Sequence, residues 1–195
     1  MIYSGTGHRL EVLRGADETI DLEVIHHKAV RYAKSILPSY ADITQGISGM
    51  AIGWDTAFAL ALLDHGVPVI AAIPFIGQES IWPEHAKKRY HEILDKCAEV
   101  HVVCEGGYAP HKYHERDKWM VERGQKMMAL WNGHPKGGTA ATVRYAKKAG
   151  KEIVNVWPGW EIFEIGCPCG CGADSESHCW NASTWDNEGG QTQIF

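Results

Sequence analysis

Residues 47–83, ISGMAIGWDTAFALALLDHGVPVIAAIPFIGQESIWP, contain the pattern that decides the fold. A strand ending near Ile47 leads into a glycine-rich turn, and an apolar helix is expected over residues 56–65, closed by Gly66. The apolar, partly β-branched run 67–73 then predicts a buried strand. This order of strand, helix and strand predicts two parallel strands joined by a right-handed crossover.

The same alternation extends to both sides of this stretch. Hydrophobic spacing predicts further strands over residues 2–4, 100–104, 127–131 and 152–157, and helices over residues 22–37, 113–125 and 139–149, with one more beginning at Pro83. The fold class is therefore α/β, a Rossmann-like open, mainly parallel sheet with helices on both faces. We expect this domain to cover residues 1–158, followed by an irregular cysteine- and glycine-rich C-terminal extension over 159–195.

The composition limits the classes of partner. With 45% hydrophobic and 22% charged residues among 195, the chain can form a packed core. A net charge of −5 argues against a long nucleic acid, whose binding depends on an excess of Lys and Arg. No apolar run approaches the ~20 residues of a membrane helix, and the N-terminus does not resemble a secretory signal. We therefore expect a cytoplasmic protein with no membrane partner.

Glycine and polar residues gather where the predicted strands end. In an open parallel sheet, ligands bind beyond the carboxyl ends of the strands. Five such ends carry these residues, at 5–9, 48–55, 74–79, 105–108 and 132–139. A single glycine-rich turn is common in any loop, but five at the same edge of a sheet predict a ligand site there.

Two of these loops lead directly into a helix, and so turn free backbone N–H groups and the helix dipole toward an anion. They are Ser48-Gly49-Met50 and Gly137-Gly138-Thr139. The Thr139 hydroxyl either adds a hydrogen-bond donor or caps the helix. Neither loop has the spacing of a dinucleotide fingerprint or of a Walker loop, which disfavours an NAD dehydrogenase and a P-loop ATPase.

Several motifs together carry a family resemblance. They are TGHR at 6–9, the stretch 47–83, RDKWMV at 116–121 and GGTAATVRYAKKAGKEIVNV at 137–156. Over residues 1–157 the chain resembles the YpsA-like branch of the SLOG superfamily, which is similar to DprA and to the LOG cytokinin-activating enzymes. The resemblance implies a Rossmann-like domain that binds a nucleotide or nucleotide-derived ligand. Our leading hypothesis is a sensor or sequestering protein for a signalling nucleotide.

The strand-end loops and the resemblance together predict a set of ligand-binding residues: Thr6, Gly7, His8, Arg9, Ser48, Gly49, Met50, Asp55, Pro74, Phe75, Gln78, Glu79, Trp82, Arg116, Asp117, Gly137, Gly138 and Thr139. Arg9 either binds a phosphate or carboxylate or forms a surface salt bridge. Asp55 either accepts ribose hydroxyls or balances a helix dipole. Trp82 either stacks on a base or packs in the fold. Arg116 and Asp117 either reach the site or form an ordinary helical ion pair.

The chain departs from the LOG enzymes at their catalytic signature. That signature, P-G-G-x-G-T-x-x-E, ends in a glutamate that serves N-glycosidic bond cleavage, whereas here P-K-G-G-T-A-A-T places Ala141 and Thr142 where acids are expected. Cleavage needs a positioned carboxylate. Glu79 is then the candidate catalytic residue, with Asp55 and Asp117 also possible. Ligand binding is favoured, and an N-glycosidic hydrolase or transferase acting on a nucleoside-type substrate is the alternative.

Four thiols and an imidazole crowd the C-terminal extension: Cys167, Cys169, Cys171, Cys179 and His178. Zinc accepts any four of these ligands, but their spacing departs from the usual C-x2-C knuckle. The extension therefore either holds a structural zinc ion or is a flexible thiol-rich tail. No other cofactor is expected.

Tryptophans suggest an assembly. Trp54, Trp82 and Trp119 fall near predicted loops or helix starts, where aromatic side chains favour protein interfaces. Two-fold symmetric dimers are the commonest soluble oligomers. We expect a homodimer or a higher homo-oligomer.

Overall fold

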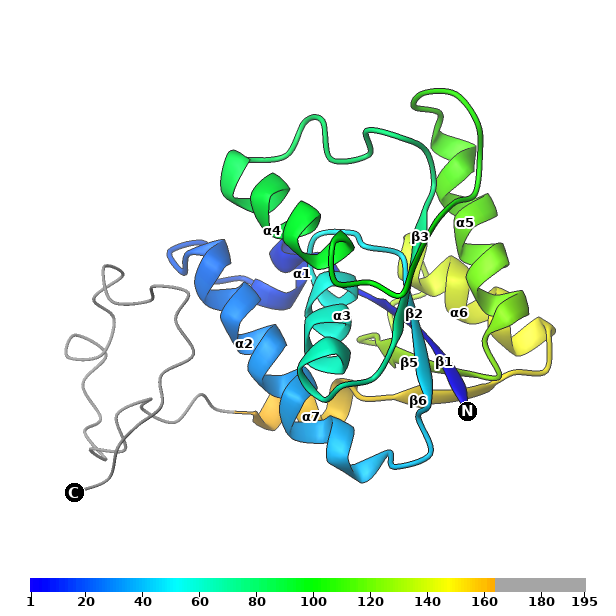
Figure 1. Ribbon diagram of the computed structural model, residues 1–195. Helices are drawn as coiled ribbons and strands as arrows, with labels where there is room; N and C mark the ends of the chain where they lie inside the picture. The colour runs from blue at the N-terminus through cyan, green and yellow to red at the C-terminus, as the bar shows by residue number, and fades with distance from the viewer. Residues whose placement is uncertain (164–195) are drawn as a thin grey trace, which may run out of the picture. The chain divides into compact units, whose positions relative to one another are not determined.

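The computed structural model describes residues 1–163, which form one compact unit (Figure 1). Its six strands are β1 (Ile2–Gly7), β2 (Gln45–Ser48), β3 (Val69–Ile73), β4 (Glu99–Val102), β5 (Lys126–Leu130) and β6 (Glu152–Asn155). Its helices are α1 (Leu10–Arg14), α2 (Leu22–Ile36), the 3-10 turn η1 (Leu37–Ser39), α3 (Trp54–Asp64), α4 (Glu84–Leu94), α5 (Pro110–Arg123), α6 (Gly138–Lys148) and α7 (Trp157–Ile162).

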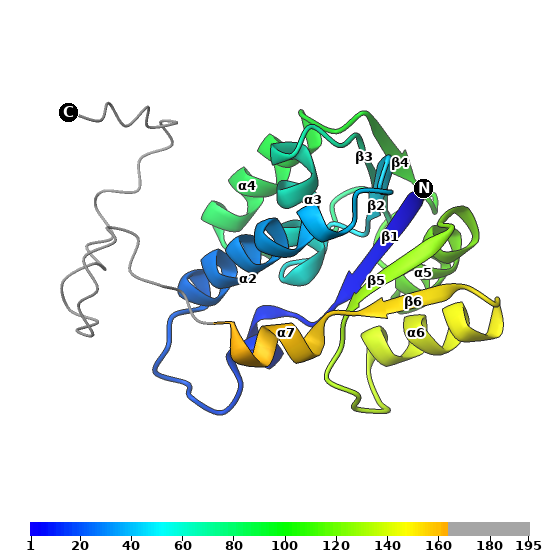
Figure 2. The same ribbon diagram turned by 90° about the horizontal axis from the view of Figure 1, so that it is seen from below.

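All strands are parallel, in the order β4-β3-β2-β1-β5-β6. Figure 2 shows α2, α3 and α4 on one face of the sheet and α5 and α6 on the other. The predicted Rossmann-like α/β class is confirmed. The chain runs from β1 outward to β4 and then crosses to β5 on the other side of β1, so the direction of strand order reverses between β1 and β5.

Two glycines of β1 allow α3 to lie unusually close to the sheet. A Cβ atom at Gly5 would overlap the Phe58 ring, and one at Gly7 would overlap Trp54. Trp54 and Phe58 are therefore completely buried between helix and sheet. Burial of Trp54 removes it from the tryptophans that we expected at an interface, because its side chain does not reach the surface.

The predicted last strand, 152–157, was too long. β6 ends at Asn155, and α7 follows it. α7 forms because Trp160 is buried against Tyr32, with ring centroids 5.8 Å apart, while the Tyr32 hydroxyl donates a hydrogen bond to the Val156 carbonyl. A six-residue helix is too short to show a period in the sequence. The compact unit runs to Phe163, beyond the expected boundary at residue 158.

The candidate zinc ligands Cys167, Cys169, Cys171 and Cys179 lie outside the described residues, so a zinc site there stays a prediction. Within residues 1–163 no three or more His, Cys, Asp or Glu side chains gather as a metal site would require. In the same range, no helix has the length and apolar character needed to cross a membrane.

A buried histidine stands apart from the apolar core. His26 on α2 is 2% exposed, and its Nδ1 atom has no hydrogen-bond partner within the described residues. Burial, assisted by the nearby charge of Arg89 and by His27 and His85, lowers the pKa of His26 to about 3. The Arg89 guanidinium and the His85 ring both pair with Glu23. The Glu23 carboxylate is therefore engaged with these two groups and does not stabilise a protonated His26.

This histidine predicts acid sensitivity. An unfolded histidine titrates near pH 6.5, so below that pH the unfolded chain binds a proton that folded His26 does not. The stability present above pH 6.5 is therefore lost as the pH falls toward 3, at up to about 1.4 kcal/mol per pH unit. In urea unfolding, the free energy of unfolding of the wild type minus that of His26→Gln should fall by about 2 kcal/mol from pH 7 to pH 5. Both proteins share every other titrating group, so a difference that is constant with pH would contradict this origin.

Candidate functional site

A pocket of about 550 Å³ lies beyond the carboxyl ends of β1 and β5, where the strand order reverses. Ligands of open α/β sheets bind at this position. The pocket includes many of the predicted residues, namely Thr6, Gly7, His8, Arg9, Asp55, Arg116, Asp117, Gly137, Gly138 and Thr139. It also includes residues outside the predicted ligand-binding set: Glu11, Val12, Ala51, Tyr113, Asn132, His134, Lys136 and Thr142.

The end of β1 supplies one wall. His8 is buried there, and its Nε2 atom accepts a hydrogen bond from the Asn132 backbone N–H at 3.1 Å. The Trp157 ring packs edge-on against it, with centroids 5.6 Å apart. Burial lowers the pKa of His8, which favours the neutral imidazole that the hydrogen bond accepted by Nε2 requires. The next residue, Arg9, is exposed and forms no hydrogen bond or close ion pair within residues 1–163, but its charge is near enough to Asp55 to act against the rise in the pKa of that carboxyl.

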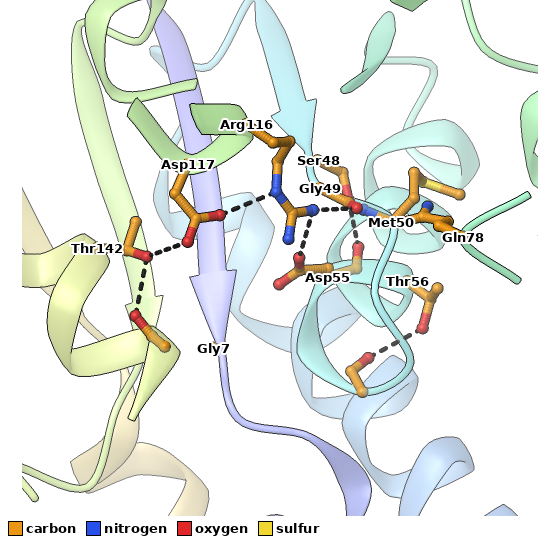
Figure 3. Close-up of polar contacts among 12 residues, drawn as sticks. Gly7, Ser48, Gly49, Met50, Asp55, Thr56, Gln78, Arg116, Asp117 and Thr142 are labelled. Carbon is orange, nitrogen blue, oxygen red and sulfur yellow. Dashed lines mark hydrogen bonds and ion pairs between the residues drawn. The ribbon is translucent and has the colours of Figure 1, made fainter. Parts of the chain in front are cut away.

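A buried network of charges supplies the opposite wall (Figure 3). Arg116 on α5 is 5% exposed, and its Nη1 atom donates to the Gly49 carbonyl. Its Nε atom lies 2.9 Å from Asp117 Oδ1, and Nη1 lies 3.7 Å from Asp55 Oδ2. The Thr142 hydroxyl donates to Asp117 Oδ2 at 2.8 Å. Arg116 and Asp117 thus pair with each other and also tie α3, α5 and α6 together at the pocket.

Asp55 differs from an ordinary carboxylate of a first helical turn. Burial raises the pKa of Asp55 to about 6, although the Arg116 guanidinium acts in the opposite direction. The carboxylate is nevertheless mostly ionised at pH 7, which leaves it an acceptor of hydrogen bonds. Perturbed carboxylates in clefts are candidates for a functional role.

The loop between β2 and α3 is closed from within. The Ser48 hydroxyl donates to the Asp55 carbonyl at 2.7 Å and accepts from the Met50 N–H at 3.1 Å. Gly49 offers its carbonyl to Arg116, and a Cβ atom there would overlap the guanidinium. Met50 is buried and holds a left-handed φ of 56°. Ser48, Gly49 and Met50 therefore lie beneath the pocket and do not line it.

The loop between β5 and α6 is open by contrast. Gly137 precedes α6 with φ 98°, and no side chain caps the helix. The Thr139 hydroxyl donates to the Gly7 carbonyl at 2.9 Å, so it links α6 to β1 and leaves the N-terminal N–H groups uncapped. Uncapped N–H groups at a helix N-terminus attract anions. Neither α3 nor α6 has a side-chain cap, but of the two loops predicted to hold an anion it is this one whose glycines line the pocket.

The predicted residues after β3 do not join the pocket: Pro74, Phe75, Gln78, Glu79 and Trp82. Gln78 Nε2 donates to the Tyr90 hydroxyl at 3.3 Å, and the Trp82 ring packs edge-on against Tyr90. Glu79 lies 3.7 Å from His91 on α4. The physical reason is strand order, since β3 is separated from β1 by β2 and its loop turns toward α4.

Two of the pocket residues that the sequence analysis missed carried a local signal. Lys136 immediately precedes the glycines of the open loop, and Tyr113 lies one helical turn before Arg116. Helical spacing of three or four residues puts side chains on one face. Asn132 and His134 are polar residues in a loop already selected, and no pattern distinguishes them there.

The YpsA sequence model, described as the YspA SLOG family, matches residues 43–157, more than half of the chain. The chain belongs to this SLOG family. The matched range contains Asp55, Arg116 and the β5–α6 loop, while the β1 wall precedes it.

Curated relatives agree with this membership. The uncharacterized SPbeta prophage-derived protein YoqJ of Bacillus subtilis is 29% identical over 137 residues, which cover 61% of this chain and 79% of YoqJ. The UPF0398 protein BH1768 of Halalkalibacterium halodurans is 28% identical over 76 residues, covering 38% of this chain and 40% of BH1768.

A solved structure shows the same fold. DNA processing protein A (DprA) from Streptococcus pneumoniae superposes with a TM-score of 0.53 at 17% sequence identity. The match covers 77% of this chain and 48% of the DprA chain, so this chain spans less than half of that protein. At this identity, the likeness establishes the fold shared by the two chains.

Proposed function

We propose that this protein binds a small phosphorylated nucleoside or a related nucleotide-derived ligand in the pocket between β1 and the β5–α6 loop, as a sensor or sequestering protein. The observation that carries the proposal is the uncapped N-terminus of α6 at the same pocket as Arg9 and Lys136. Within residues 1–163, neither cationic side chain forms an ion pair. The helix dipole and these two cationic side chains together favour a phosphate.

The wall formed by Arg116, Asp55 and Asp117 is suited to an uncharged sugar next to that phosphate. The single positive charge of Arg116 faces two carboxylates, Asp55 and Asp117, so this wall has an excess of negative charge and suits the uncharged part of a ligand. The Asp55 carboxylate lines the pocket and can accept hydrogen bonds from ribose hydroxyls. A ligand with an anion at one end and hydroxyl groups beside it matches both walls.

The geometry favours binding over N-glycosidic hydrolysis. Glu79, the candidate catalytic residue, is not among the pocket-lining residues and lies near His91. Asp55 and Asp117, the other candidates, are both paired with Arg116. At the place of the LOG glutamate stands Thr142, whose hydroxyl cannot act as a carboxylate base.

Replacing Arg9 by Ala tests the proposal. If Arg9 binds a phosphate, its removal should weaken the affinity for a nucleoside 5′-monophosphate by roughly 10-fold to 100-fold, because a hydrogen bond to a charged group contributes about 1.5–3 kcal/mol. Calorimetry against a panel of mono-, di- and cyclic nucleotides and ADP-ribose measures this. Arg123→Ala, on α5 outside the pocket lining, is the matched control. Absence of binding by the whole panel, or an unchanged affinity in Arg9→Ala, would contradict the proposal.

A further inference from the structure

An aromatic ring extends the charged wall of the pocket. Tyr113 lies three and four residues before Arg116 and Asp117 on α5, so all three share one face of the helix. Four residues after Arg116, Met120 is buried against the sheet. Because that face points to the sheet and α5 starts beyond the strand ends, Tyr113 overhangs the carboxyl edge and lines the pocket.

The ring of Tyr113 is held by neighbours that do not stack on it. Phe75, which is 3% exposed, has its centroid 5.6 Å away at an interplanar angle of 80°. Tyr108 has its centroid 6.5 Å away at 65°. Edge-to-face contacts of this kind fix an aromatic ring. Within residues 1–163, no aromatic side chain lies parallel to Tyr113, so the stacking position on this ring is not taken by another ring.

The order of the strands also fixes the order in which the groups of the pocket follow one another along the carboxyl edge of the sheet. The open anion site follows β5, Asp55 belongs to the helix after β2, and Phe75, which supports Tyr113, follows β3. Across the sheet edge, the sequence of groups is therefore anion site, hydroxyl acceptor and aromatic ring. A nucleotide has its phosphate, sugar and base in the same order.

We propose that Tyr113 is the stacking platform for the heterocyclic base of the ligand, so that the ligand class is a nucleoside phosphate with its base attached and not a bare sugar phosphate. This inference rests on the proposed function of the same pocket. It replaces Trp82, whose ring packs on Tyr90 away from the pocket. The other rings among the lining residues are the imidazoles of His8 and His134.

The test compares ligands with and without a base. Calorimetry and competition measure the four ribonucleoside 5′-monophosphates and ribose 5-phosphate with the wild type, Tyr113→Leu and Tyr113→Phe. Tyr113→Leu should weaken the best-bound nucleotide by roughly 10-fold to 100-fold, the range of base stacking on an aromatic side chain. The affinity of Tyr113→Leu for ribose 5-phosphate should differ from that of the wild type by less than about twofold. Tyr113→Phe should retain nucleotide binding because it keeps the ring.

Tyr145→Leu on α6, outside the pocket lining, controls for the loss of a tyrosine elsewhere, and unfolding midpoints verify that each variant folds. Equal weakening of nucleotide and ribose 5-phosphate would show that Tyr113 only shapes the pocket, and unchanged nucleotide affinity would place the base elsewhere. Either result overturns the inference while the proposed function stands. If the wild type binds neither class of ligand, both fail together.

Discussion

Replacing Arg116 by methionine is expected to lower the free energy of unfolding by about 3–5 kcal/mol, because removing one partner of a buried ion pair leaves uncompensated charge. Asp55 and Asp117 would lose their shared cation, and the Gly49 carbonyl would lose its donor. Methionine keeps the apolar stem of the side chain, so the effect reports on the guanidinium. Urea unfolding followed by circular dichroism measures the change.

The matched control is Arg123→Met, at the C-terminal end of the same helix, whose guanidinium lies over the Trp119 ring and forms no buried ion pair within residues 1–163. Adding Asp55→Asn and Asp117→Asn to Arg116→Met should recover part of the loss, since the uncompensated carboxylates are then removed. A loss of less than about 1 kcal/mol in Arg116→Met would show that the network contributes little to stability.

Replacing Trp160 by alanine in the full chain is expected to cost about 3–5 kcal/mol, the range for removing a buried tryptophan. Trp160 is 4% exposed on α7, packs on Tyr32 and lies under the Lys28 ammonium at 4.5 Å. Thermal or urea unfolding measures the loss. The same contact sets where the chain can be shortened without loss of stability, because deletion after Gly159 removes Trp160 and deletion after Phe163 retains it.

The two truncations therefore make a matched pair. A chain ending at Gly159 should be less stable than one ending at Phe163 by an amount close to the effect of Trp160→Ala. Ile162→Ala, at a side chain 81% exposed on the same helix, should change stability by less than about 0.5 kcal/mol. Equal stability of the two truncated chains would mean that α7 is not part of the core.

The alternation of strands and helices was predictable because it depends on local spacing. The apolar, β-branched composition of 67–73 and the glycine that ends the preceding helix are local features, and the structure confirms the two elements as β3 and α3. α7 could not be predicted in this way. Its six residues form a helix because Trp160 meets Tyr32, which is distant in the sequence.

The candidate site likewise has features that are local in the sequence and features that depend on contacts between distant residues. Glycine-rich strand ends are local features, and they predicted a site at the carboxyl edge of the sheet, where the pocket lies. Two loops with the same apparent chemistry nevertheless took different roles, because Arg116 closes the one at Gly49 while Thr139 bonds to Gly7 and leaves the other open. These choices depend on side chains that come from distant parts of the chain.

Local pattern thus sufficed for the fold class, and it predicted a ligand site at the carboxyl edge, where the structure has a pocket that Arg9 and Asp55 line. Tertiary structure alone decided which loops meet. Strand order puts β1 between β2 and β5, so the β5–α6 loop joins the pocket and the loop after β3, with Glu79 and Trp82, does not. A sequence contains the preferences of each segment, but strand order arises from packing between segments that are far apart in the chain.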